Sequence, residues 1–407
     1  MFEIQHRKLS DMEDQGEIEL GRGEVISTID LRASPGEYPV YSSSAVGTGK
    51  FGQYGKYMFD ESLITWSVDG GGRPFLRKKH KFSVTNVSGF LRIKKPDIWN
   101  YEYLHAALVK AHQRIQFDYQ MKAHPSVIRE LYKLRWVPIY EQQTIAQVLD
   151  TLDTQIQKTE ALIAKLEKIK EGLLHDLLTR GIDQSGQLRP TPEQAPELYK
   201  ESALGLIPKE WEVDRLTARA ALPKGQVSPL LSPYKKMVLV APDHIETGTA
   251  RLISKETAEE QNAISGKYLF AAGDVLYSKI RPYLRKAILA DFGGLCSADM
   301  YPLRPSDETC PRFLLSVVLG HHFSRFAESV SMRSGFPKIN RAELAEFSTA
   351  WPPLNEQRQI SSCLASAESK TAAELEALCK LEDLKKGLMD DLLSGQVRVT
   401  PLLKDAV

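Results

Sequence analysis

Cysteine is scarce in this sequence, and its spacing argues against two kinds of site. Only 4 of the 407 residues are cysteine, and no two of them form a Cys-x-x-Cys pair. Zinc sites and disulfide frameworks need thiols at short or regular spacings, so neither is indicated. The 9 histidines also form no set with metal-ligand spacing. We therefore expect no metal site in this chain, and this cysteine usage fits a reducing cytoplasm.

Long apolar runs are absent too. No segment approaches the roughly 18 consecutive apolar residues that a membrane-spanning helix needs. The first residues are acidic and polar, which is unlike a secretory signal peptide. We expect a cytoplasmic protein without membrane contacts. A composition of 42% apolar and 26% charged residues is typical of globular proteins, and a length of 407 residues predicts two or more domains.

The motifs of several enzyme classes are missing as well. The segment 45–51, Ala-Val-Gly-Thr-Gly-Lys-Phe, has part of a phosphate-binding loop. It lacks the leading glycine, and Phe51 stands where a Ser or Thr would hold magnesium. The sequence contains no Asn-Pro-Pro-aromatic or Asp-Pro-Pro-Tyr block for amino-methylation, and no helicase signature. We predict that the chain is not an enzyme and has no catalytic residues or cofactors of its own.

One long segment, by contrast, occurs twice. Residues 138–179 and 353–394 align without a gap at a constant offset of 215 residues, and each copy has Glu-Gln three residues after its initial proline. A repeat of this length indicates that the chain consists of two similar halves.

Each copy predicts a long helix with a coiled-coil seam. Positions spaced four and three residues apart are apolar at eight of ten places in the first copy, and the second copy repeats this stripe more weakly. A helix of about 40 residues is roughly 60 Å long. Such a seam needs a partner, and we predict that the two copies pair antiparallel about a pseudo-two-fold axis. The first stripe comprises Ile145, Leu149, Leu152, Ile156, Thr159, Ile163, Leu166, Lys170, Leu173 and Leu177. The second comprises Ile360, Leu364, Ala367, Thr371, Glu374, Leu378, Leu381, Lys385, Leu388 and Leu392.

Glycine and asparagine mark particular positions in these helices. Gly181 and Gly395 stand where C-terminal glycines are expected, and Asn355 is predicted to cap the second helix. Gly172 and Gly387 lie inside the helices, where glycine costs about 1 kcal/mol. We interpret them as sites of close helix approach or of a mild kink.

The segments between the helices predict two similar domains. Runs rich in β-branched and aromatic residues at 38–44, 63–68 and 82–85 indicate strands, and Asn100 is expected to cap a helix from Tyr101 to about Gln116. In the second half, Arg-Pro-Phe-Leu-Arg-Lys at 73–78 returns as Arg-Pro-Tyr-Leu-Arg-Lys at 281–286. A helix from Pro311 to about Glu328 is expected to match the one at 101–116.

The predicted fold class is therefore α+β, with two similar domains separated by two long antiparallel coiled-coil helices in a pseudo-two-fold internal repeat. The predicted division is a first domain at 1–137, a long helix at 138–180, a linker at 181–203, a second domain at 204–352, a long helix at 353–395 and a tail at 396–407.

Positive charge is concentrated between the predicted helices. Residues 39–137 hold 16 basic and 7 acidic side chains, and residues 205–352 hold 19 basic and 16 acidic ones. This surplus favours a polyanionic partner, although surface lysines of an ordinary soluble domain give a similar count. Two basic domains on a rigid spacer can read two DNA half-sites on successive turns, about 34–36 Å apart. Because the domains are similar and not identical, the two half-sites should differ in sequence.

The order of these segments resembles the specificity (S) subunits of Type I restriction-modification systems. The resemblance rests on the Pro…Glu-Gln…Ile blocks at 138–145 and 353–360 and on the helix ends Leu-Leu-Thr at 177–179 and Leu-Leu-Ser at 392–394. It covers nearly the whole chain. Residues 1–9 lack the Leu-Gly-x-Ile-Pro-x-x-Trp lead-in that opens the second domain. Further matching segments are 181–183, 186–190 and 204–211 around the linker and 38–44, 64–66 and 273–282 in the domains.

This resemblance implies a recognition subunit without catalysis of its own. In this family the two domains bind the halves of an interrupted double-stranded DNA site, and the paired helices set the gap. The helices also dock two methyltransferase (M) subunits, and the assembly recruits endonuclease/translocase (R) subunits. The implied role is DNA methylation and phage defence. S-adenosylmethionine, ATP and magnesium belong to those partners.

The candidate DNA contacts are basic, aromatic and polar side chains of the two domains. Arg and Lys bind phosphates or pair with guanine edges, and the cluster at 73–78 recurs at 281–286. Solvated strands, turns and loops would carry the same residue types, so both interpretations stay open here. The predicted contacts are Ser43, Ser44, Lys50, Tyr54, Lys56, Arg73, Arg77, Lys78, Lys79, Lys279, Arg281, Tyr283, Arg285, Lys286, Arg333, Lys338 and Asn340.

Two other classes of function are compatible with parts of the sequence. A coiled-coil scaffold with protein-binding domains predicts no DNA affinity beyond a charge-driven background. A self-contained nuclease or methylase predicts activity of the isolated chain, and no set of residues supports it.

Overall fold

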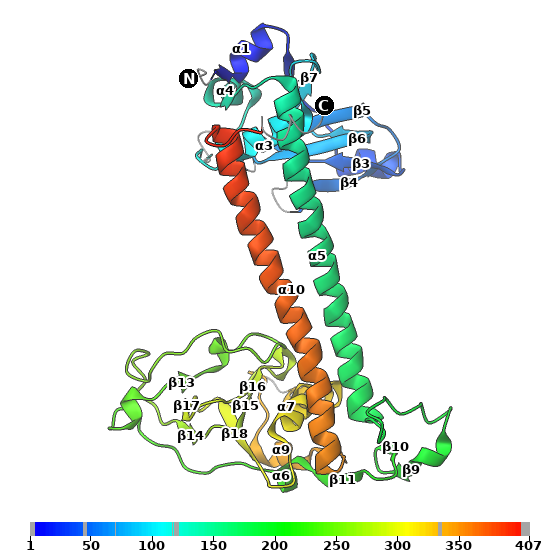
Figure 1. Ribbon diagram of the computed structural model, residues 1–407, viewed down its shortest axis with the longest axis vertical. Coiled ribbons are helices and arrows are strands. Elements are labelled where there is room, and N and C mark those ends of the chain that lie inside the picture. The colour runs from blue at the N-terminus through cyan, green and yellow to red at the C-terminus, as the bar shows by residue number, and fades with distance from the viewer. Residues whose placement is uncertain are drawn as a thin grey trace. The chain divides into compact units, whose positions relative to one another are not determined.

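The protein consists of two compact units, each with a mixed α and β domain and parts of two long helices (Figure 1). The computed structural model describes residues 5–43, 47–69, 71–115, 117, 122–332 and 336–399. Unit 1 comprises residues 1–161 and 375–407, and unit 2 comprises residues 162–374. The division falls within helices α5 (Ile139–Thr179) and α10 (Leu354–Ser394), which belong to both units. The limits predicted for domains, linker and tail stay a prediction.

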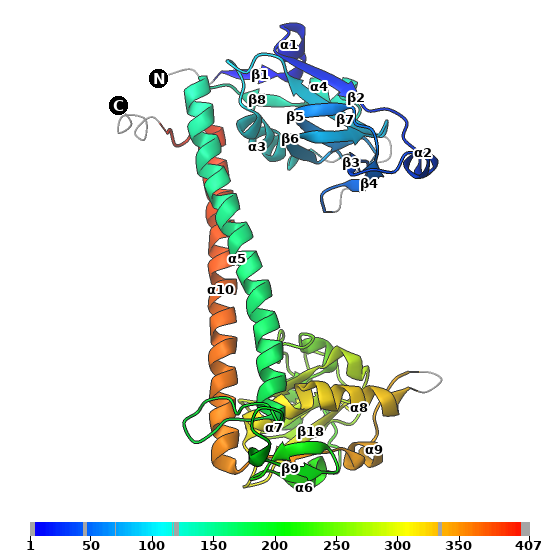
Figure 2. The ribbon, with the colours of Figure 1, turned by 90° about the vertical axis from the view of Figure 1, so that its right-hand side faces the viewer.

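Unit 1 is built around a six-stranded sheet in the order β2-β7-β5-β6-β3-β4 (Figure 2). Neighbouring strands are antiparallel, except for β3 and β6, which are parallel. One face packs on helix α3 (Tyr101–His112), where Ile64, Trp66 and Leu91 join Leu104 in one core. The strands are β2 (Ile18–Arg22), β3 (Tyr38–Tyr41), β4 (Lys50–Tyr54), β5 (Phe59–Ser67), β6 (Pro74–Val84) and β7 (Ser88–Ile93).

The predicted elements of the first domain lie on this framework. The runs at 38–44, 63–68 and 82–85 fall on β3, on β5 and at the end of β6. Asn100 caps α3 as expected, since its Oδ1 accepts a hydrogen bond from Tyr103 N at 2.8 Å. The helix ends at His112, earlier than predicted. The remaining elements are α1 (Leu9–Asp14), α2 (Thr28–Ala33), α4 (Pro125–Leu131) and the antiparallel pair β1 (His6–Lys8) and β8 (Lys133–Arg135).

Unit 2 contains several smaller sheets. A four-stranded sheet has the order β12-β18-β15-β16, a three-stranded sheet has the order β13-β17-β14, and two further pairs are β11–β19 and β9–β10. The strands are β9 (Tyr199–Ser202), β10 (Gly205–Pro208), β11 (Glu212–Arg215), β12 (Ala220–Ala221), β13 (Leu239–Val240), β14 (Tyr268–Phe270), β15 (Val275–Ser278), β16 (Ala287–Leu289), β17 (Gly294–Cys296), β18 (Met300–Pro305) and β19 (Ser348–Trp351). The helices are α6 (Leu216–Arg219), α7 (Pro311–Leu319), α8 (His321–Ser331) and α9 (Arg341–Glu346), with 3-10 turns η1 (Pro196–Leu198), η2 (Tyr234–Lys236), η3 (Pro242–His244) and η4 (Pro282–Leu284).

The two units share a topology, which confirms the predicted internal repeat and the α+β fold class. The strand order β2-β7-β5-β6 of unit 1 corresponds to β12-β18-β15-β16 of unit 2, and the pair β1–β8 corresponds to β11–β19. Each sheet is followed along the chain by a helix, α3 or α7, that packs beside it. The two units therefore have the same arrangement of strands and helix but different side chains on it.

The helix predicted from Pro311 to Glu328 is wrong as a single element. It is two helices, α7 and α8, because Gly320 adopts an extended conformation with φ −67° and ψ 154° between them. A Cβ atom at this position would lie 2.8 Å from Leu178 Cδ1. Gly320 thus breaks the helix where α5 approaches it.

The long helices carry the predicted seam. All ten stripe positions of α5 and all ten of α10 are buried or half-buried, while most other positions between Thr151 and Glu171 are exposed. The seam follows heptad spacing, so the 3.5-residue repeat and not the apolar content decides which side chains are covered.

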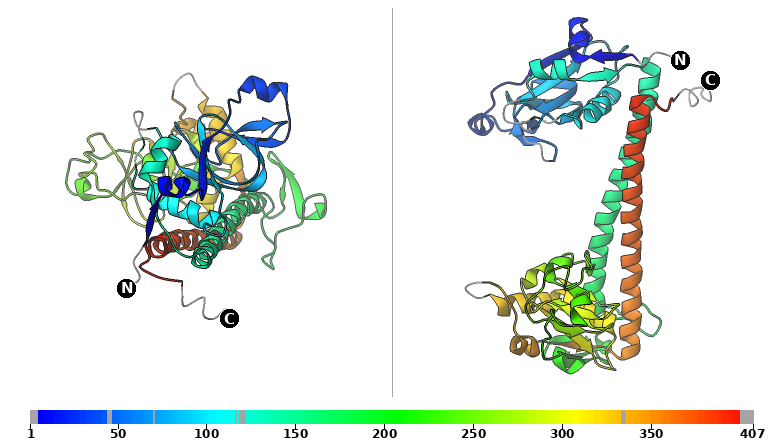
Figure 3. Two further views of the ribbon diagram at one scale, coloured as in Figure 1. Left: turned by 90° about the horizontal axis from the view of Figure 1, so that it is seen from above. Right: turned by 90° about the vertical axis from the view of Figure 1, so that its left-hand side faces the viewer.

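Contacts within each unit show that the helices run antiparallel (Figure 3). In unit 1, Asp153 of α5 pairs with Lys385 of α10, and Glu141 at the start of α5 pairs with Arg398, beyond the end of α10. In unit 2, Leu177 near the end of α5 shares a core with Ile360 near the start of α10. The predicted antiparallel pairing is confirmed.

The repeated Glu-Gln pair anchors each long helix to its own domain. In unit 1, Gln142 Oε1 accepts a hydrogen bond from Asn100 N at 2.9 Å, and its Nε2 donates to Ile98 O and Val137 O. In unit 2, Gln357 makes the same bonds with Cys310 N, Glu308 O and Pro352 O. Both amides are buried, so each fixes a long helix to the start of α3 or α7.

The predicted linker at 181–203 folds onto unit 2. The Ile182 N–H donates to Glu356 Oε1 at 3.0 Å, and Arg189 pairs with the same carboxylate. Arg189 lies in a Gly-Gln-Leu-Arg segment that matches Gly-Gln-Val-Arg at 395–398, so Arg398 with Glu141 repeats this arrangement in unit 1. Arg189, which follows α5, thus holds the start of α10, and Arg398, which follows α10, holds the start of α5.

Two expectations about special residues need correction. A Cβ atom at Gly172 or Gly387 would meet no atom within 4 Å, so neither glycine permits a close approach of helices, and the alternative of a mild kink stays a prediction. Helix α10 begins at Leu354, which places Asn355 in its first turn and not at the N-cap. The glycines that follow the helices do adopt the left-handed conformation, with φ +63° at Gly181 and +82° at Gly395.

Candidate nucleic-acid interface

In unit 1, strand β6 carries the first predicted basic cluster. Arg73 is exposed and lies over the Phe75 ring at 5.5 Å. Lys78 and Lys79 stand at a β-bulge, because Leu63 pairs with Arg77 whereas Glu61 pairs with His80. Lys78 pairs with Asp150 of α5 at 3.3 Å, and both side chains are largely exposed, so this pair is weak. Arg73, Lys78 and Lys79 are therefore the exposed cations of this cluster, of which Lys78 has a weak partner in Asp150.

Arg77 has a different role. Its side chain is buried, its guanidinium lies 3.6 Å from the Tyr41 ring centroid, and its Nε donates to Thr65 Oγ1 at 3.0 Å. Burial lowers the pKa of Arg77 to about 10. A guanidinium enclosed in this way does not reach a groove, so Arg77 is better assigned to positioning Tyr41 and Phe75 than to DNA contact.

The loop and strand after β3 place the next candidates. Ser43 O accepts a hydrogen bond from Ser67 Oγ at 2.9 Å, so this residue joins the loop to β5. Lys50 and Lys56 are exposed at the two ends of β4, and Tyr54 is half-buried. Ser44 lies outside the described residues. The two lysines are thus the accessible candidates here.

A cation–aromatic group beside these lysines was missed in the sequence. Lys81 Nζ lies 4.9 Å from the ring centroid of Tyr57 and 5.7 Å from that of Tyr38, and the two rings pack edge to face at 5.1 Å. The spacing along the chain gives no hint of this group, because its members come from three different segments.

In unit 2, backbone pairing brings three predicted contacts together. Arg281 N donates to Pro337 O and Ile339 N donates to Lys279 O, each at 2.9 Å. The segment 279–281 therefore lies beside 337–339, with Lys338 directly opposite Ile280, and the three predicted contacts lie on neighbouring segments. Lys338 and Arg281 are exposed, and Arg281 lies 5.0 Å from the ring centroid of Phe336.

The turn between β15 and β16 is strained in a way that favours a functional role. Arg281 and Arg285 both adopt the left-handed conformation, with φ 47° and 48°, on either side of turn η4. This conformation costs a non-glycine residue about 1–3 kcal/mol and is concentrated at functional sites. The turn presents Tyr283, which is 53% exposed, next to Arg281. We therefore place the candidate interface of unit 2 at Lys279, Arg281, Tyr283, Phe336 and Lys338.

Three predicted contacts of unit 2 serve the fold instead. Arg285 Nε donates to Leu319 O at 3.0 Å and so caps the end of α7. Lys286 Nζ donates to Pro242 O at 2.8 Å. Asn340 is the N-cap of α9, where its Oδ1 accepts a hydrogen bond from Glu343 N at 2.9 Å. Arg333 lies outside the described residues.

The repeated Arg-Pro-x-Leu-Arg-Lys cluster occupies equivalent places in the two topologies with different local structures. At 73–78 it opens β6 after strand β5, and at 281–286 it forms turn η4 between β15 and β16. The second arginine is held inside the domain in both units. The first arginine is exposed in both, so it is the shared candidate.

Arg341 was also missed and borders the unit 2 interface. It donates to Leu222 O at 3.1 Å and to Pro223 O at 2.7 Å, and its guanidinium lies over the rings of Tyr268 and Tyr301. Lys279 Nζ lies 5.5 Å from the same Tyr301 ring. Tyr301 thus lies between the Arg341 and Lys279 cations. The only sequence feature that could have indicated Arg341 is its position just after a predicted loop.

The described part of the chain offers no group of three His, Cys, Asp or Glu side chains able to hold a metal ion. Within the same residues, none of the helices is both long enough and apolar enough to cross a membrane. Burial raises the pKa of the Cys296 thiol to about 12, so that thiol is not a nucleophile at neutral pH.

Comparison with known proteins places these features in a family. The family model described as the Type I restriction modification DNA specificity domain matches residues 4–168 and 222–383. The specificity subunit of the Type I restriction enzyme EcoDI from Escherichia coli is 30% identical over 272 residues, which are 63% of this chain and 60% of that relative. The matched region therefore spans less than two thirds of that protein.

A second relative covers more of the chain at lower identity. The specificity subunit of the Type I restriction enzyme MjaVIII from Methanocaldococcus jannaschii is 23% identical over 361 residues, which are 84% of this chain and 80% of the relative. Among solved structures, the S subunit of a Type I restriction-modification system from M. genitalium has a TM-score of 0.58 at 15% identity and covers 97% of both chains. This similarity concerns the fold. From the family match over both halves of its length, the chain belongs to the Type I restriction-modification DNA specificity family.

Proposed function

We propose that this chain is the DNA sequence-specificity subunit of a Type I restriction-modification complex and binds an asymmetric, bipartite DNA site. The proposal rests on one observation: the two units share a topology, but the residues on their candidate interfaces differ. Both units share an order of four strands and the same Glu-Gln anchor to the long helices. Their candidate interfaces differ in residues and in local structure, so each should read a different half-site.

The chemistry of both candidate interfaces suits DNA. Exposed Arg and Lys side chains can bind phosphates, and an arginine can pair with the O6 and N7 atoms of guanine. In unit 2, Arg281 is the candidate base reader, because its strained turn and the ring of Phe336 fix its direction. Lys338 lies on the adjacent segment and is the candidate phosphate contact.

The partners follow from the proposed role. We propose that two methyltransferase (M) subunits dock on the chain and that endonuclease/translocase (R) subunits join the assembly. S-adenosylmethionine, ATP and magnesium then belong to those subunits, and the chain itself contributes recognition without catalysis. The antiparallel helices serve as the spacer that sets the gap between the half-sites.

A domain exchange tests this proposal. Residues 205–352 are replaced by the corresponding domain of another specificity subunit, and the exchanged chain with its methyltransferase subunits selects DNA from a random library. We expect one half-site to change while the other half-site and the gap stay the same. A change in both halves would contradict separate reading by the units. Selection of no sequence at all by the unaltered assembly would favour a protein-binding scaffold.

A further inference from the structure

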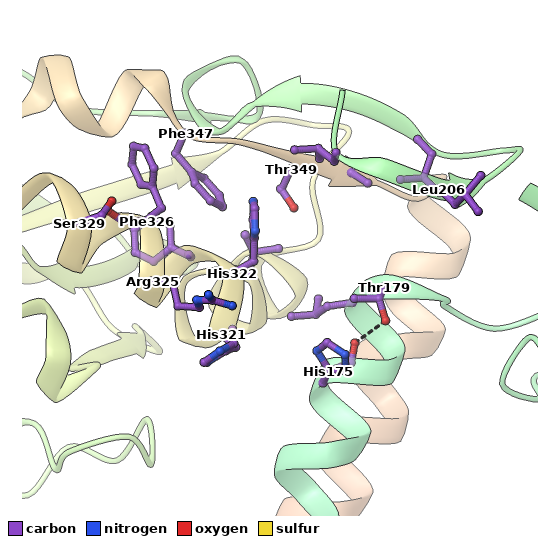
Figure 4. A pocket seen from close by; sticks show the side chains of 17 residues that line it. His175, Thr179, Leu206, His321, His322, Arg325, Phe326, Ser329, Phe347 and Thr349 are labelled. Atoms are coloured by element: carbon purple, nitrogen blue, oxygen red, sulfur yellow. Dashed lines mark hydrogen bonds between the residues drawn. The ribbon is translucent and has the colours of Figure 1, made fainter. Parts of the chain in front are cut away.

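Unit 2 contains a cavity of about 510 Å³ between the end of α5, the hairpin β9–β10, helix α8 and strand β19 (Figure 4). This volume lies within the range of about 300–1,000 Å³ that is usual for binding pockets. Its wall is mainly apolar, and no Asp or Glu is among its described lining residues. The apolar side chains that line it include Leu178, Leu206, Ile207, Val317, Phe326 and Phe347.

Basic side chains lie at the opening of this cavity, which we call the groove of unit 2. His175 comes from α5, while His321, His322 and Arg325 come from α8 (Figure 4). Arg325 is exposed and forms no ion pair or hydrogen bond with the residues that the structure describes. An uncompensated guanidinium beside an apolar wall favours a ligand that combines an apolar group with an anion.

Exposed leucines at the rim favour a protein segment as this ligand. Leu204 and Leu206 of the hairpin β9–β10 are 39% and 52% exposed, and both line the groove. A molecule held inside the cavity would leave their outer surfaces in water, whereas a partner surface would cover them. Apolar side chains that gather next to a cavity in this way mark sites of protein association.

The equivalent position of unit 1 is built differently. The Glu-Gln anchors align Asn100 with Cys310, which places Lys110 of α3 where unit 2 has Gly320. The helix repeat places Asp390 where unit 2 has His175.

These two replacements bind each other in unit 1. Lys110 Nζ pairs with Asp390 Oδ1 at 3.2 Å and donates to Asp390 O at 2.7 Å. In unit 1 a lysine thus stands at the position of Gly320, and an acid stands at the position of His175. The lysine of unit 1 is therefore paired with an acid, whereas Arg325 of unit 2 has no ion-pair partner among the described residues.

We propose that this groove binds a segment of the methyltransferase subunit that carries an apolar side chain next to an Asp or Glu. The inference rests on the proposed function, in which two such subunits dock on the chain. The subunit at unit 2 gains an apolar and ionic contact that the subunit at unit 1 lacks. The two copies therefore bind with unequal affinity, and the copy at unit 2 binds first.

The test titrates the full chain with the purified methyltransferase subunit of the same system and counts bound copies by native mass spectrometry and calorimetry. Variants Leu206→Glu and Arg325→Glu alter the groove at exposed side chains. The matched controls are Leu230→Glu, at a leucine that is 62% exposed outside the groove, and Lys236→Glu, at an exposed lysine. Melting curves of all four variants check that unit 2 stays folded.

We expect two unequal binding steps for the unaltered chain. Each groove variant should weaken the tighter step by about tenfold or more and leave the weaker step unchanged, while both controls behave as the unaltered chain does. Two equal steps that the groove variants leave unchanged would overturn the groove inference alone. Equal weakening of both steps would also overturn it. Failure of the unaltered chain to bind any methyltransferase subunit would overturn the proposed partner together with the groove.

Discussion

The carboxylate of Glu356 and the guanidinium of Arg189 form a buried ion pair, with Nη2 3.0 Å from Oε2. Each residue is only 8% exposed. Trp211 Nε1 and Ile182 N also donate to this carboxylate, so its hydrogen-bonding capacity is largely used. The pair fastens the segment that follows α5 to the first turn of α10.

Removing one partner of this pair should destabilise unit 2. Glu356→Gln leaves the buried Arg189 cation with only the exposed carboxylate of Glu210, at 3.0 Å, as a counter-charge, so the variant should lose up to about 3–5 kcal/mol of the free energy of unfolding. The double variant Glu356→Leu with Arg189→Met should lose less, because no charge is then left unpaired. Urea unfolding followed by tryptophan fluorescence measures both. Glu376→Gln, which breaks an exposed pair with Lys380, should leave the midpoint unchanged, and an equal loss in that control would contradict the assignment.

The glycines inside the long helices should be replaceable. Gly172→Ala and Gly387→Ala introduce a Cβ that meets nothing within 4 Å. Each should therefore stabilise its helix by about 0.5–1 kcal/mol, since alanine restricts the unfolded chain. Gly181→Ala is the matched contrast, because φ is +63° and a Cβ would collide with Glu356 and Trp211. Thermal unfolding should show two gains and one loss, and a loss at Gly172 would reveal an undetected packing role.

Substitutions of the two arginines that flank turn η4 should have different effects, one on DNA binding and the other on stability. Arg281→Ala should weaken binding to the specific site by about 1–3 kcal/mol and relax the sequence preference of one half-site. Arg285→Ala should instead lower the melting temperature, because the end of α7 loses its cap at Leu319. Binding and melting are measured on both variants. The reverse pattern, with binding lost at Arg285 and stability lost at Arg281, would contradict the assignment.

Lys338→Ala provides the complementary test of a phosphate contact. It should weaken binding about equally on specific and unrelated DNA and reduce the slope of log affinity against log salt by about one. Filter binding at several salt concentrations measures that slope. A selective loss at one base pair would instead identify Lys338 as a base reader.

Unit 1 should lose stability in mild acid. Burial lowers the pKa of His105 below its ordinary value of 6.5, while a hydrogen bond to Pro74 O opposes the shift. The unfolded chain therefore binds a proton that the folded chain does not, and the free energy of unfolding falls as the pH drops below about 6.5. Above that pH both states are neutral, and the full stability is present. His105→Gln should flatten the profile below about pH 6.5, and an unchanged profile would remove His105 as a cause.

Sequence periodicity was sufficient to predict the long helices and the side chains that their seam covers. A heptad stripe reports directly which side chains a partner covers, so all twenty stripe positions lie buried or half-buried. The repeat offset also identified Gln142 and Gln357 as a matched pair, although only coordinates show that both bind the start of a helix.

Residue type was a poor guide to accessible cations. Arg77 and Arg285 have the same chemistry as Arg73 and Arg281, yet each is held by a neighbour distant in sequence, Thr65 or Leu319. Hydrogen bonds between residues distant in sequence produce no periodic pattern of residue types, so the sequence does not predict them. The pairing of segment 279–281 with 337–339 was hidden for the same reason, since isolated bridges need no repeating pattern.

Local breaks were also invisible to helix periodicity. Gly320 divides a continuous apolar run into α7 and α8, and the run itself stays helical in pattern on both sides. At this break, a Cβ on residue 320 would lie 2.8 Å from Leu178 of another element, a contact that the local sequence does not reveal. Likewise, the counterpart of the Arg189–Glu356 pair, Arg398 with Glu141, joins residues 257 positions apart.

The spacer role makes a geometric prediction. Inserting one heptad after Gln157 in α5 and one after Ala372 in α10 keeps the seam in register and lengthens both helices by about 10 Å, close to three base pairs at about 3.4 Å each. The gap between the half-sites should widen by about that amount, with both half-sequences unchanged. DNA selection from a random library measures the gap, and an unaltered gap at full affinity would contradict the spacer role.

The central claim is that one chain reads two different half-sites at a fixed separation. The most direct measurement is base-resolution mapping of methylated adenines in DNA from cells that carry this chain with its methyltransferase subunit. We predict a single interrupted motif with two unlike halves, which is lost when the chain is deleted. A continuous motif, or a palindrome with identical halves, would contradict the account.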